Sequence, residues 1–273
     1  MDDARTTRTD PTSSGGRRLR AIREEAGRTQ LWVELEAGLG TGYLQRVESG
    51  RVMQPARDTL GRILQALEAT YNEWQTVMRL FGYLTPTDVP DARERRWARD
   101  LATPQLESFP FPAYALDCLH CLVAVNSAAS ELLGITSDDA ESADDRQPSI
   151  LEQWFDEESH LGSMVVEPDR FLLALVTAFR YEAKRFREEQ WAREVVRQMR
   201  AIPRFERYWQ MTETQSPPLG ASRALIPLRL RSLDGQALSF RLSSEPFIDD
   251  TRFRVVYYFP DDLETMHVFV AGA

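Results

Sequence analysis

The sequence predicts two domains of different class: an all-α helix-turn-helix bundle, then an α+β domain with an antiparallel sheet. Its 273 residues exceed the usual size of one domain, and the 42% that are hydrophobic suffice for two cores. Apolar residues recur at helical spacing before residue 84, whereas five short runs with strand character follow residue 110. We therefore expect helices alone in the first domain and helices with strands in the second.

Changes in composition mark the expected domain boundaries. Residues 1–16 are rich in Thr, Asp, Ser and Gly, and we expect a disordered tail because they offer too little apolar surface to fold. A DNA-binding domain of five short helices is expected at 17–84. Three prolines surround a charged run in 85–105, which predicts a linker with a short helix before the second domain at 106–273.

The second domain opens with two apolar runs, 113–116 and 122–125, whose short separation predicts a hairpin. A mostly helical middle covers 127–211, and its longest helix is expected to start near Asp169, where apolar residues form one buried stripe. Three further strands are predicted at 225–230, 237–242 and 253–259. This order favours an antiparallel sheet over an alternating strand–helix series.

Charge is distributed unevenly along the chain. The formal net charge is −9, yet residues 17–83 contain ten arginines against eight acidic residues. A net-positive end suits DNA, and DNA repels the acidic remainder. No stretch reaches the roughly 18 apolar residues that a bilayer demands, and the first sixteen residues lack the apolar centre of a signal peptide. We expect a cytoplasmic protein that makes no membrane contact.

The most informative segment is TQLWVELEAGLGTGYLQRVESG at 29–50. Thr29 can cap the start of a helix, and Gly38 supplies the turn that reorients the chain. Leu44 and Val47 fall where a second helix must pack on the first. The segment resembles, without a gap, the phage-repressor or XRE-type helix-turn-helix family, which implies a DNA-binding function.

The resemblance implies a set of DNA contacts. Gln30 and Arg51 are expected to bind phosphates, which positions the protein without reading sequence. Thr41, Gln45 and Arg46 are candidates for reading base edges, because Gln suits adenine and Arg suits guanine. The predicted DNA-binding residues are Gln30, Thr41, Gly42, Tyr43, Gln45, Arg46 and Arg51.

Several positions depart from the family pattern or have a structural role instead. Glu34 stands where the family prefers a small residue, and its carboxylate is expected to turn sideways into water. Gly40 and Gly42 lie near the start of the second motif helix, where each costs about 1 kcal/mol relative to alanine in a helix interior. Glu48 is expected to cap neighbouring backbone amides. These departures leave an alternative open: a protein-interaction or dimerisation module with a degenerate helix-turn-helix and no ligand.

Four pieces of the second domain suggest its family: PFPAYALDCLHCLVAVNSAASELLG at 110–134, AFRYEAKRF at 178–186, FERYW at 205–209 and VVYYFPDD at 255–262. In this order behind a helix-turn-helix, they resemble the MmyB-like transcription regulators. The resemblance implies a PAS-like domain that holds a fatty acid or a similar small apolar ligand.

The residues themselves predict an aromatic-rich helical layer on a small sheet, which either encloses an apolar cavity or fills a core. A bound carboxylate needs a guanidinium or a phenol at the cavity wall, and the candidate anchors are Arg180, Tyr114 and Asn126. Phe179 and Trp209 are the candidate aromatic wall residues.

No other motif indicates a metal centre or an enzyme. Cys118 and Cys121 have C-x-x-C spacing, but no second ligand pair lies at zinc-site distance, so we expect a turn between two strands. A redox pair and a haem ligated by a single histidine are the weaker alternatives. No catalytic signature occurs, so we expect neither catalysis nor a required cofactor. The expected partners are double-stranded DNA, the apolar ligand and a second copy of the chain, because this motif class reads paired half-sites.

Overall fold

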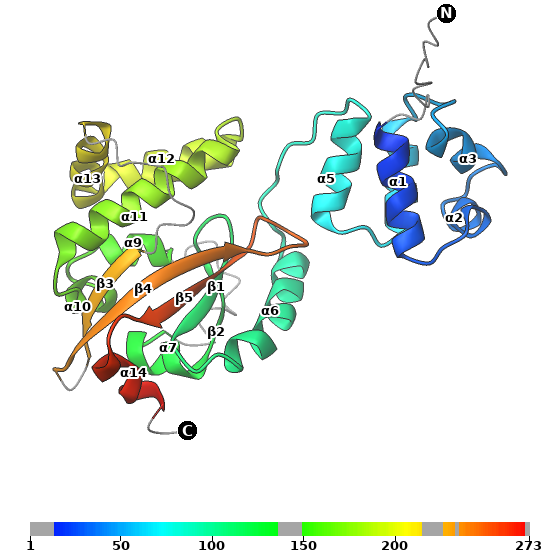
Figure 1. Ribbon diagram of the computed structural model, residues 1–273. Helices are drawn as coiled ribbons and strands as arrows, with labels where there is room; N and C mark the ends of the chain where they lie inside the picture. Colours follow the sequence, from blue (N-terminus) through cyan, green and yellow to red (C-terminus); the bar gives the residue numbers. More distant parts are fainter. Residues whose placement is uncertain (1–13, 136–148, 215–225, 233–234, 271–273) are drawn as a thin grey trace, which may run out of the picture. The chain divides into compact units, whose positions relative to one another are not determined.

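The computed structural model describes residues 14–135, 149–214, 226–232 and 235–270. The chain divides into two compact units (Figure 1). The first contains the residues up to Pro86 together with 248–250, and the second contains the remainder. Most of the expected tail lies outside the described residues.

The described part of the first unit is all helical. Its elements are α1 (Ser14–Glu25), α2 (Gln30–Glu36), α3 (Tyr43–Glu48), α4 (Arg57–Ala66) and α5 (Tyr71–Leu80). Their apolar sides share one core, whose fully buried members include Leu19, Val33, Leu44, Val47, Leu60, Ile63 and Val77. The predicted five-helix bundle with a helix-turn-helix is confirmed.

Helix α1 begins earlier than the sequence predicted. The structure places Ser14, Gly15 and Gly16 in the helix, although they were expected in the tail. A Cβ atom on Gly15 would lie 2.8 Å from the ring of Phe81, just beyond the end of α5. Glycine therefore lets α1 approach this ring closely, and the small residues that suggested a tail serve this packing.

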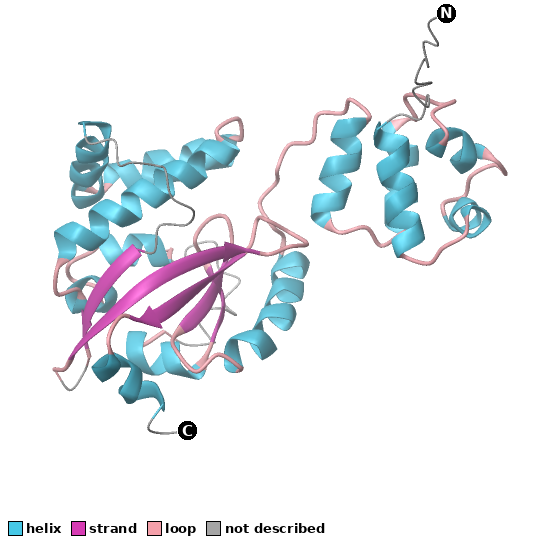
Figure 2. Ribbon diagram, viewed as in Figure 1, coloured by secondary structure: helices cyan, strands magenta, loops and turns pink. Residues whose placement is uncertain are grey.

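The second unit is built on a five-stranded sheet (Figure 2). The strands are β1 (Ala113–Leu116), β2 (Leu122–Val125), β3 (Ile226–Arg231), β4 (Ala237–Pro246) and β5 (Arg254–Pro260). They lie in the order β2-β1-β5-β4-β3, and every neighbouring pair is antiparallel. The predicted antiparallel sheet is confirmed; the expected first residue of β3, at position 225, lies outside the described residues.

Helices cover both faces of this sheet. Besides α6 (Ala92–Glu107), the helices of this unit are α7 (Ser127–Leu133), α9 (Ile150–Phe155), α10 (His160–Met164), α11 (Pro168–Ala183), the 3-10 turn η1 (Lys184–Phe186), α12 (Gln190–Ala201), α13 (Pro203–Thr214) and α14 (Leu263–Val270). Helix α11 contacts α13 and β3, and α13 contacts α12. Their buried aromatic side chains meet the sheet in one core, which includes Phe155, Phe171, Phe179, Phe205, Tyr208, Phe240 and Tyr258.

Helix α6 (Ala92–Glu107) occupies most of the segment that was expected to be a linker. Its small inward residues Ala98 and Ala102 lie with Ala113 and Ala115 of β1 in a separate core. The neighbouring β1 residue Tyr114 belongs to the main core, so α6 covers the opposite face of the sheet. Of the charges that suggested a linker, Arg93, Arg96 and Asp100 are exposed on the outward side of this 16-residue helix, which belongs to the second unit. Arg95 and Arg99 instead donate to backbone carbonyls of β2.

Candidate nucleic-acid interface and ligand-binding domain

The helix-turn-helix consists of α2, a turn and α3. Thr29 caps α2 by accepting a hydrogen bond from the backbone N–H of Trp32 at 3.1 Å. Gly38 adopts a φ of 61° in the turn, a left-handed conformation that glycine takes without strain. Thr41, Gln45 and Arg46 are exposed, so the three candidates for base reading are free to meet a groove. Their contact with DNA stays a prediction.

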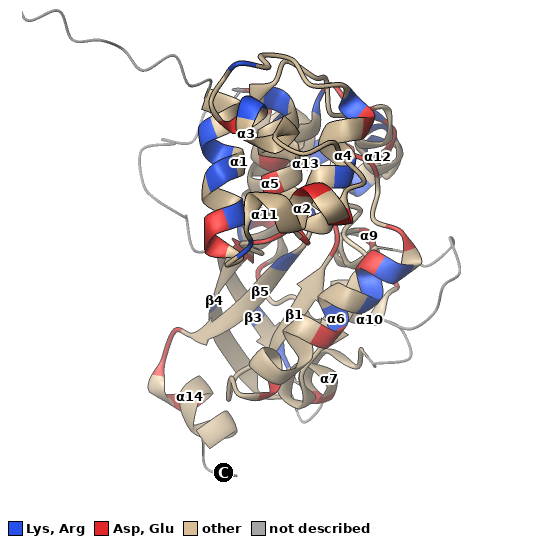
Figure 3. Ribbon diagram, turned by 90° about the vertical axis from the view of Figure 1, so that its right-hand side faces the viewer, with Lys and Arg blue, Asp and Glu red and all other residues tan. Residues whose placement is uncertain are grey.

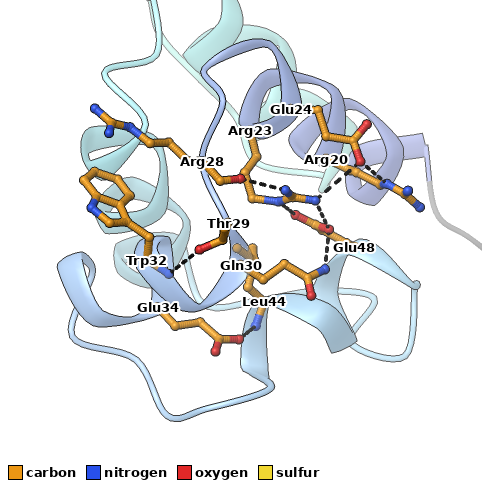
Figure 4. Close-up of polar contacts among 10 residues, drawn as sticks. All are labelled: Arg20, Arg23, Glu24, Arg28, Thr29, Gln30, Trp32, Glu34, Leu44 and Glu48. Carbon is orange, nitrogen blue, oxygen red and sulfur yellow. Dashed lines mark hydrogen bonds and ion pairs between the residues drawn. The ribbon is translucent and has the colours of Figure 1, made fainter.

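Glu34 holds the start of α3, and the expectation that its carboxylate turns into water is wrong. The residue is only 3% exposed. Its Oε2 accepts the backbone N–H of Gly42 at 3.0 Å. Its Oε1 accepts that of Leu44 at 2.8 Å, the contact drawn in Figure 4. The first N–H groups of a helix have no partner within it and carry partial positive charge, so a carboxylate is stabilising there.

The glycines of this segment lie outside the helix, so the expected cost of glycine in a helix interior does not apply. Helix α3 begins at Tyr43, and Gly42 is its N-cap residue with a φ of 79°. Gly40 precedes the cap and accepts the Tyr43 N–H through its carbonyl at 3.1 Å. At position 42 the left-handed backbone favours glycine.

Glu48 holds the other end of α3, but not as a cap of backbone amides, which was the expectation. Its carboxylate is buried and accepts hydrogen bonds from Arg23 Nε at 2.7 Å and Nη2 at 3.1 Å. The hydrogen bond to Glu48 raises the pKa of the Arg23 guanidinium. Arg23 also donates to the carbonyl of Arg28, so one buried ion pair ties α3 to α1 and to the loop before α2.

The predicted phosphate contacts lie beside this ion pair. Gln30 Nε2 donates to Glu48 Oε2 at 2.7 Å, which engages one amide hydrogen of Gln30 inside the unit (Figure 4). A phosphate contact would use the second one. Arg51 is exposed, and the guanidinium of Arg46 lies 5.7 Å from the ring centre of Tyr43. Figure 3 shows further basic positions, in blue, along the ribbon of α1, so the first unit carries several arginines besides those of its helix-turn-helix.

In the second unit, the structure brings together three of the predicted ligand residues. The rings of Phe179 and Trp209 are 6.3 Å apart, and the Arg180 guanidinium lies 4.4 Å from the centre of the Trp209 ring. Arg180 is not simply solvated, because it donates to Thr212 Oγ1 at 2.7 Å and forms an ion pair with Glu213. A second guanidinium, that of Arg200, lies 5.3 Å from the centre of the same indole.

Trp209 also presents an unsatisfied polar atom. The indole side chain is buried, and its Nε1 has no hydrogen-bond acceptor among the residues that the structure describes. A buried donor without a partner costs about 1–3 kcal/mol. An acceptor atom that reaches this nitrogen would recover that free energy.

The other two predicted anchors lie on the sheet and at its edge. Tyr114 is buried, and its hydroxyl lies 3.3 Å from that of Tyr258. Burial raises the pKa of both phenols, so both remain protonated hydrogen-bonding groups.

Asn126 has a structural role that the sequence did not suggest. Its Oδ1 accepts the backbone N–H groups of Ala113 and Ala129, so it caps α7 and holds β1. Its Nδ2 donates to the carbonyl of Leu106 in the last turn of α6 and to those of Phe109 and Phe111 in the connection to β1. The structure therefore assigns the amide of Asn126 to the backbone rather than to a ligand.

Sequence reasoning missed a buried polar network next to the aromatic core. Arg254 of β5 is buried, contacts His120 Nδ1 at 2.6 Å through Nη2, and forms an ion pair with Glu182 of α11. Burial lowers the pKa of Arg254 to about 10, and burial beside this guanidinium holds the pKa of His120 well below its usual value. The network links a strand, a turn and a helix that are distant in sequence, so no local sequence pattern predicts it.

The two cysteines lie in the turn between β1 and β2, as expected, and both are free thiols. Asp117 organises this turn, because its Oδ1 accepts the backbone N–H groups of Leu119 and Cys121. Burial raises the pKa of Cys121 to about 12 and raises that of Cys118 further. Both thiols are therefore protonated at neutral pH, which makes them poor nucleophiles and metal ligands.

The described residues offer neither a metal-binding cluster nor a membrane-spanning helix. No group of three or more His, Cys, Asp or Glu side chains is arranged there to hold a metal ion. Among the same residues, no helix combines the length and apolar character needed to cross a bilayer.

Comparison with known families agrees with this geometry. A helix-turn-helix domain family matches residues 16–75, which contain α2, α3 and α4, all but the first two residues of α1, and the first half of α5. The ligand-binding domain of MmyB-like transcription regulators matches residues 98–269, well over half of the chain. No curated protein sequence matches the chain. A DNA-binding helix-turn-helix joined to a ligand-binding domain is the composition of a ligand-responsive transcription regulator, and the chain belongs to the MmyB-like transcription regulator family.

Proposed function

We propose that this regulator binds operator DNA as a homodimer through α3 and that a fatty-acid-like molecule in its PAS-like second unit alters this binding. The observation that carries the DNA part is the construction of α3. Buried carboxylates hold both ends of the helix, while Thr41, Gln45 and Arg46 remain exposed. A rigidly held helix with polar side chains outward suits major-groove reading, and two copies suit a palindromic site.

The ligand part is supported by the aromatic layer between the sheet and the helices α11 and α13. An apolar chain is compatible with the aromatic side chains here, such as Phe179 and Phe205, whose ring centres are 5.5 Å apart. A carboxylate head group would find the guanidinium of Arg180 and the unsatisfied Nε1 of Trp209 close together. Because these rings now touch, the ligand must enter by separating them, and this movement offers a route to a second conformation.

Such a regulator works only if the ligand distinguishes two states. Ligand binding shifts DNA affinity by the ratio of the ligand affinities for the DNA-bound and DNA-free protein. Equal ligand affinity in the two states would exclude regulation by this route, whatever the ligand's absolute affinity.

The DNA part is tested by selecting, from a random library, the DNA sequences that the full chain binds, and then measuring its affinity for them. The affinity should fall steeply with salt concentration because phosphate contacts release counterions. Arg46→Ala should weaken binding by about 1–3 kcal/mol and relax the preference at one base pair. Arg185→Ala, which removes an exposed arginine of the second unit, is the matched control and should leave binding unchanged.

Two results would redirect the proposal. A loss for Arg46→Ala that is equal over all sequences would make Arg46 a phosphate contact only. Salt-independent behaviour on DNA, together with a core free of ligand, would instead indicate a protein-interaction module. Native mass spectrometry tests the ligand directly, since a bound species of a few hundred daltons should be retained and then lost on denaturation.

A further inference from the structure

The outward side of α6 carries an apolar pair that nothing in the described chain covers. Trp97 and Leu101 lie one helical turn apart and are 41% and 48% exposed. Trp97 packs edge-on against Phe247 and Phe253, with ring centres 6.4 and 6.2 Å away, so this tryptophan is held in place rather than free in solvent. A fixed, half-exposed tryptophan beside a leucine is typical of an interface anchor.

Charges of both signs flank this pair. Arg93, Arg96 and Asp100 are exposed, and none of the three forms an ion pair with another described residue. Together with the apolar pair they line an open hollow of about 480 Å³. By contrast, Arg95 of the same helix is paired, at 3.2 Å, with Asp117. The unpaired charges therefore gather on the exposed side of α6.

We propose that this face, Arg93, Arg96, Trp97, Asp100 and Leu101, is the surface through which two copies of the chain dimerise, with their α6 helices antiparallel. A two-fold axis near residue 98 places Arg96 of one copy opposite Asp100 of the other, and the same pair recurs by symmetry. Trp97 of each copy then lies one residue from the axis and meets Trp97 of its partner, and Leu101 lies just beyond the ion pairs. Opposite charges four residues apart on one face make the face complementary to itself only in this antiparallel direction.

The size of the face sets the expected strength of the dimer. A helix of 16 residues is about 24 Å long, and one face of it buries less than the roughly 800 Å² per partner of a standard interface. We therefore expect a dimer that dissociates at micromolar concentration. This inference rests on the homodimer part of the proposed function and adds the surface that forms it.

Sedimentation equilibrium of the full chain, free of DNA, tests the pairing by charge reversal. Arg96→Asp and Asp100→Arg should each raise the dimer dissociation constant about ten-fold, because each reversal turns both symmetric ion pairs into like-charge pairs. The double variant R96D/D100R swaps the charges and should return the constant to within about three-fold of the original. Glu131→Arg reverses an exposed charge on α7 and is the matched control.

Each outcome decides the matter. A dimer that is unaffected by the single reversals, or that the double variant fails to restore, overturns the role of α6 but leaves a homodimer with another interface. A chain that stays monomeric at all concentrations overturns the dimer itself. Neither result bears on DNA binding by α3, which is measured separately by the salt dependence of DNA affinity and by the Arg46→Ala variant. Circular dichroism of each variant establishes that the fold is retained.

Discussion

Removing the carboxylate of Glu34 should loosen the start of the recognition helix α3. This carboxylate accepts two backbone N–H groups, of Gly42 and Leu44, and the N-cap residue offers no side chain in its place. Glu34→Ala deletes both acceptors. Loss of a helix cap costs about 0.5–2 kcal/mol, and a buried donor left unpaired costs about 1–3 kcal/mol. Because Leu44 is fully buried, water does not easily replace the acceptor, and we expect a total loss of about 2–4 kcal/mol.

Hydrogen exchange measures this loss where it occurs, because the amide of Leu44 reports the opening of the start of α3. The free energy of unfolding of the first unit gives a second reading. Glu36→Ala is the matched control, since Glu36 is an exposed carboxylate on the same helix, α2, and its removal should cost less than about 0.5 kcal/mol. Glu34→Gln keeps one acceptor oxygen and should fall between the two.

The effect on DNA binding separates positioning from contact. Glu34 faces the inside of the unit, so Glu34→Ala should weaken DNA binding without changing the slope of affinity against salt concentration. If the Leu44 amide exchanges at the same rate in Glu34→Ala and Glu36→Ala, and the first unit has the same free energy of unfolding in both, the carboxylate of Glu34 does not hold α3 and the reasoning fails.

Two further predictions concern the second unit. Trp209→Phe removes the unsatisfied buried donor and leaves a smaller aromatic ring in its place. The gain from removing the donor offsets the loss of packing, so the free energy of unfolding should change little, yet binding of dodecanoate should weaken about ten-fold in calorimetry. Unchanged affinity would exclude the indole nitrogen as an anchor. Burial lowers the pKa of His120 in the folded state. Below about pH 6.5 the unfolded chain therefore binds a proton that the folded chain does not. The free energy of unfolding should fall as pH falls, by up to about 1.4 kcal/mol per pH unit. His120→Gln should flatten this dependence in urea unfolding followed from pH 7 to pH 5, and an unaltered slope would show that other groups cause it.

The sequence was informative wherever the signal is local. Period-3.6 and period-2 apolar patterns predicted the five helices of the first unit and the strands of the second, because one buried face leaves its spacing in the sequence. A short helix was predicted in this segment, but the full length of α6 and its packing on the sheet were not, because its buried side includes small residues such as Ala98 and Ala102 while its arginines dominate the composition. Alanine gives a weak apolar signal, although it packs closely against a sheet.

Contacts between distant residues could not be predicted in this way. Asn126 is a common residue at a helix start, but the three carbonyls that it binds lie fifteen to twenty positions earlier. The pairing of Arg254 with His120 and Glu182 joins a strand to a turn and to a helix. Such roles depend on which elements become neighbours, and only the folded arrangement reveals the partner.

The departures of the helix-turn-helix from its family pattern are connected. Taken position by position, Glu34 and the glycines at 40 and 42 look like separate defects of a DNA-binding motif. In the structure, the glycines remove a side-chain cap from α3, and the carboxylate supplies the missing acceptors from α2. One carboxylate thereby receives the N-cap N–H and an N–H of the first turn, the two kinds of donor that a capping box satisfies with two side chains. The motif has exchanged one capping device for another, so its unusual sequence is an argument for a defined recognition helix rather than for a degenerate one.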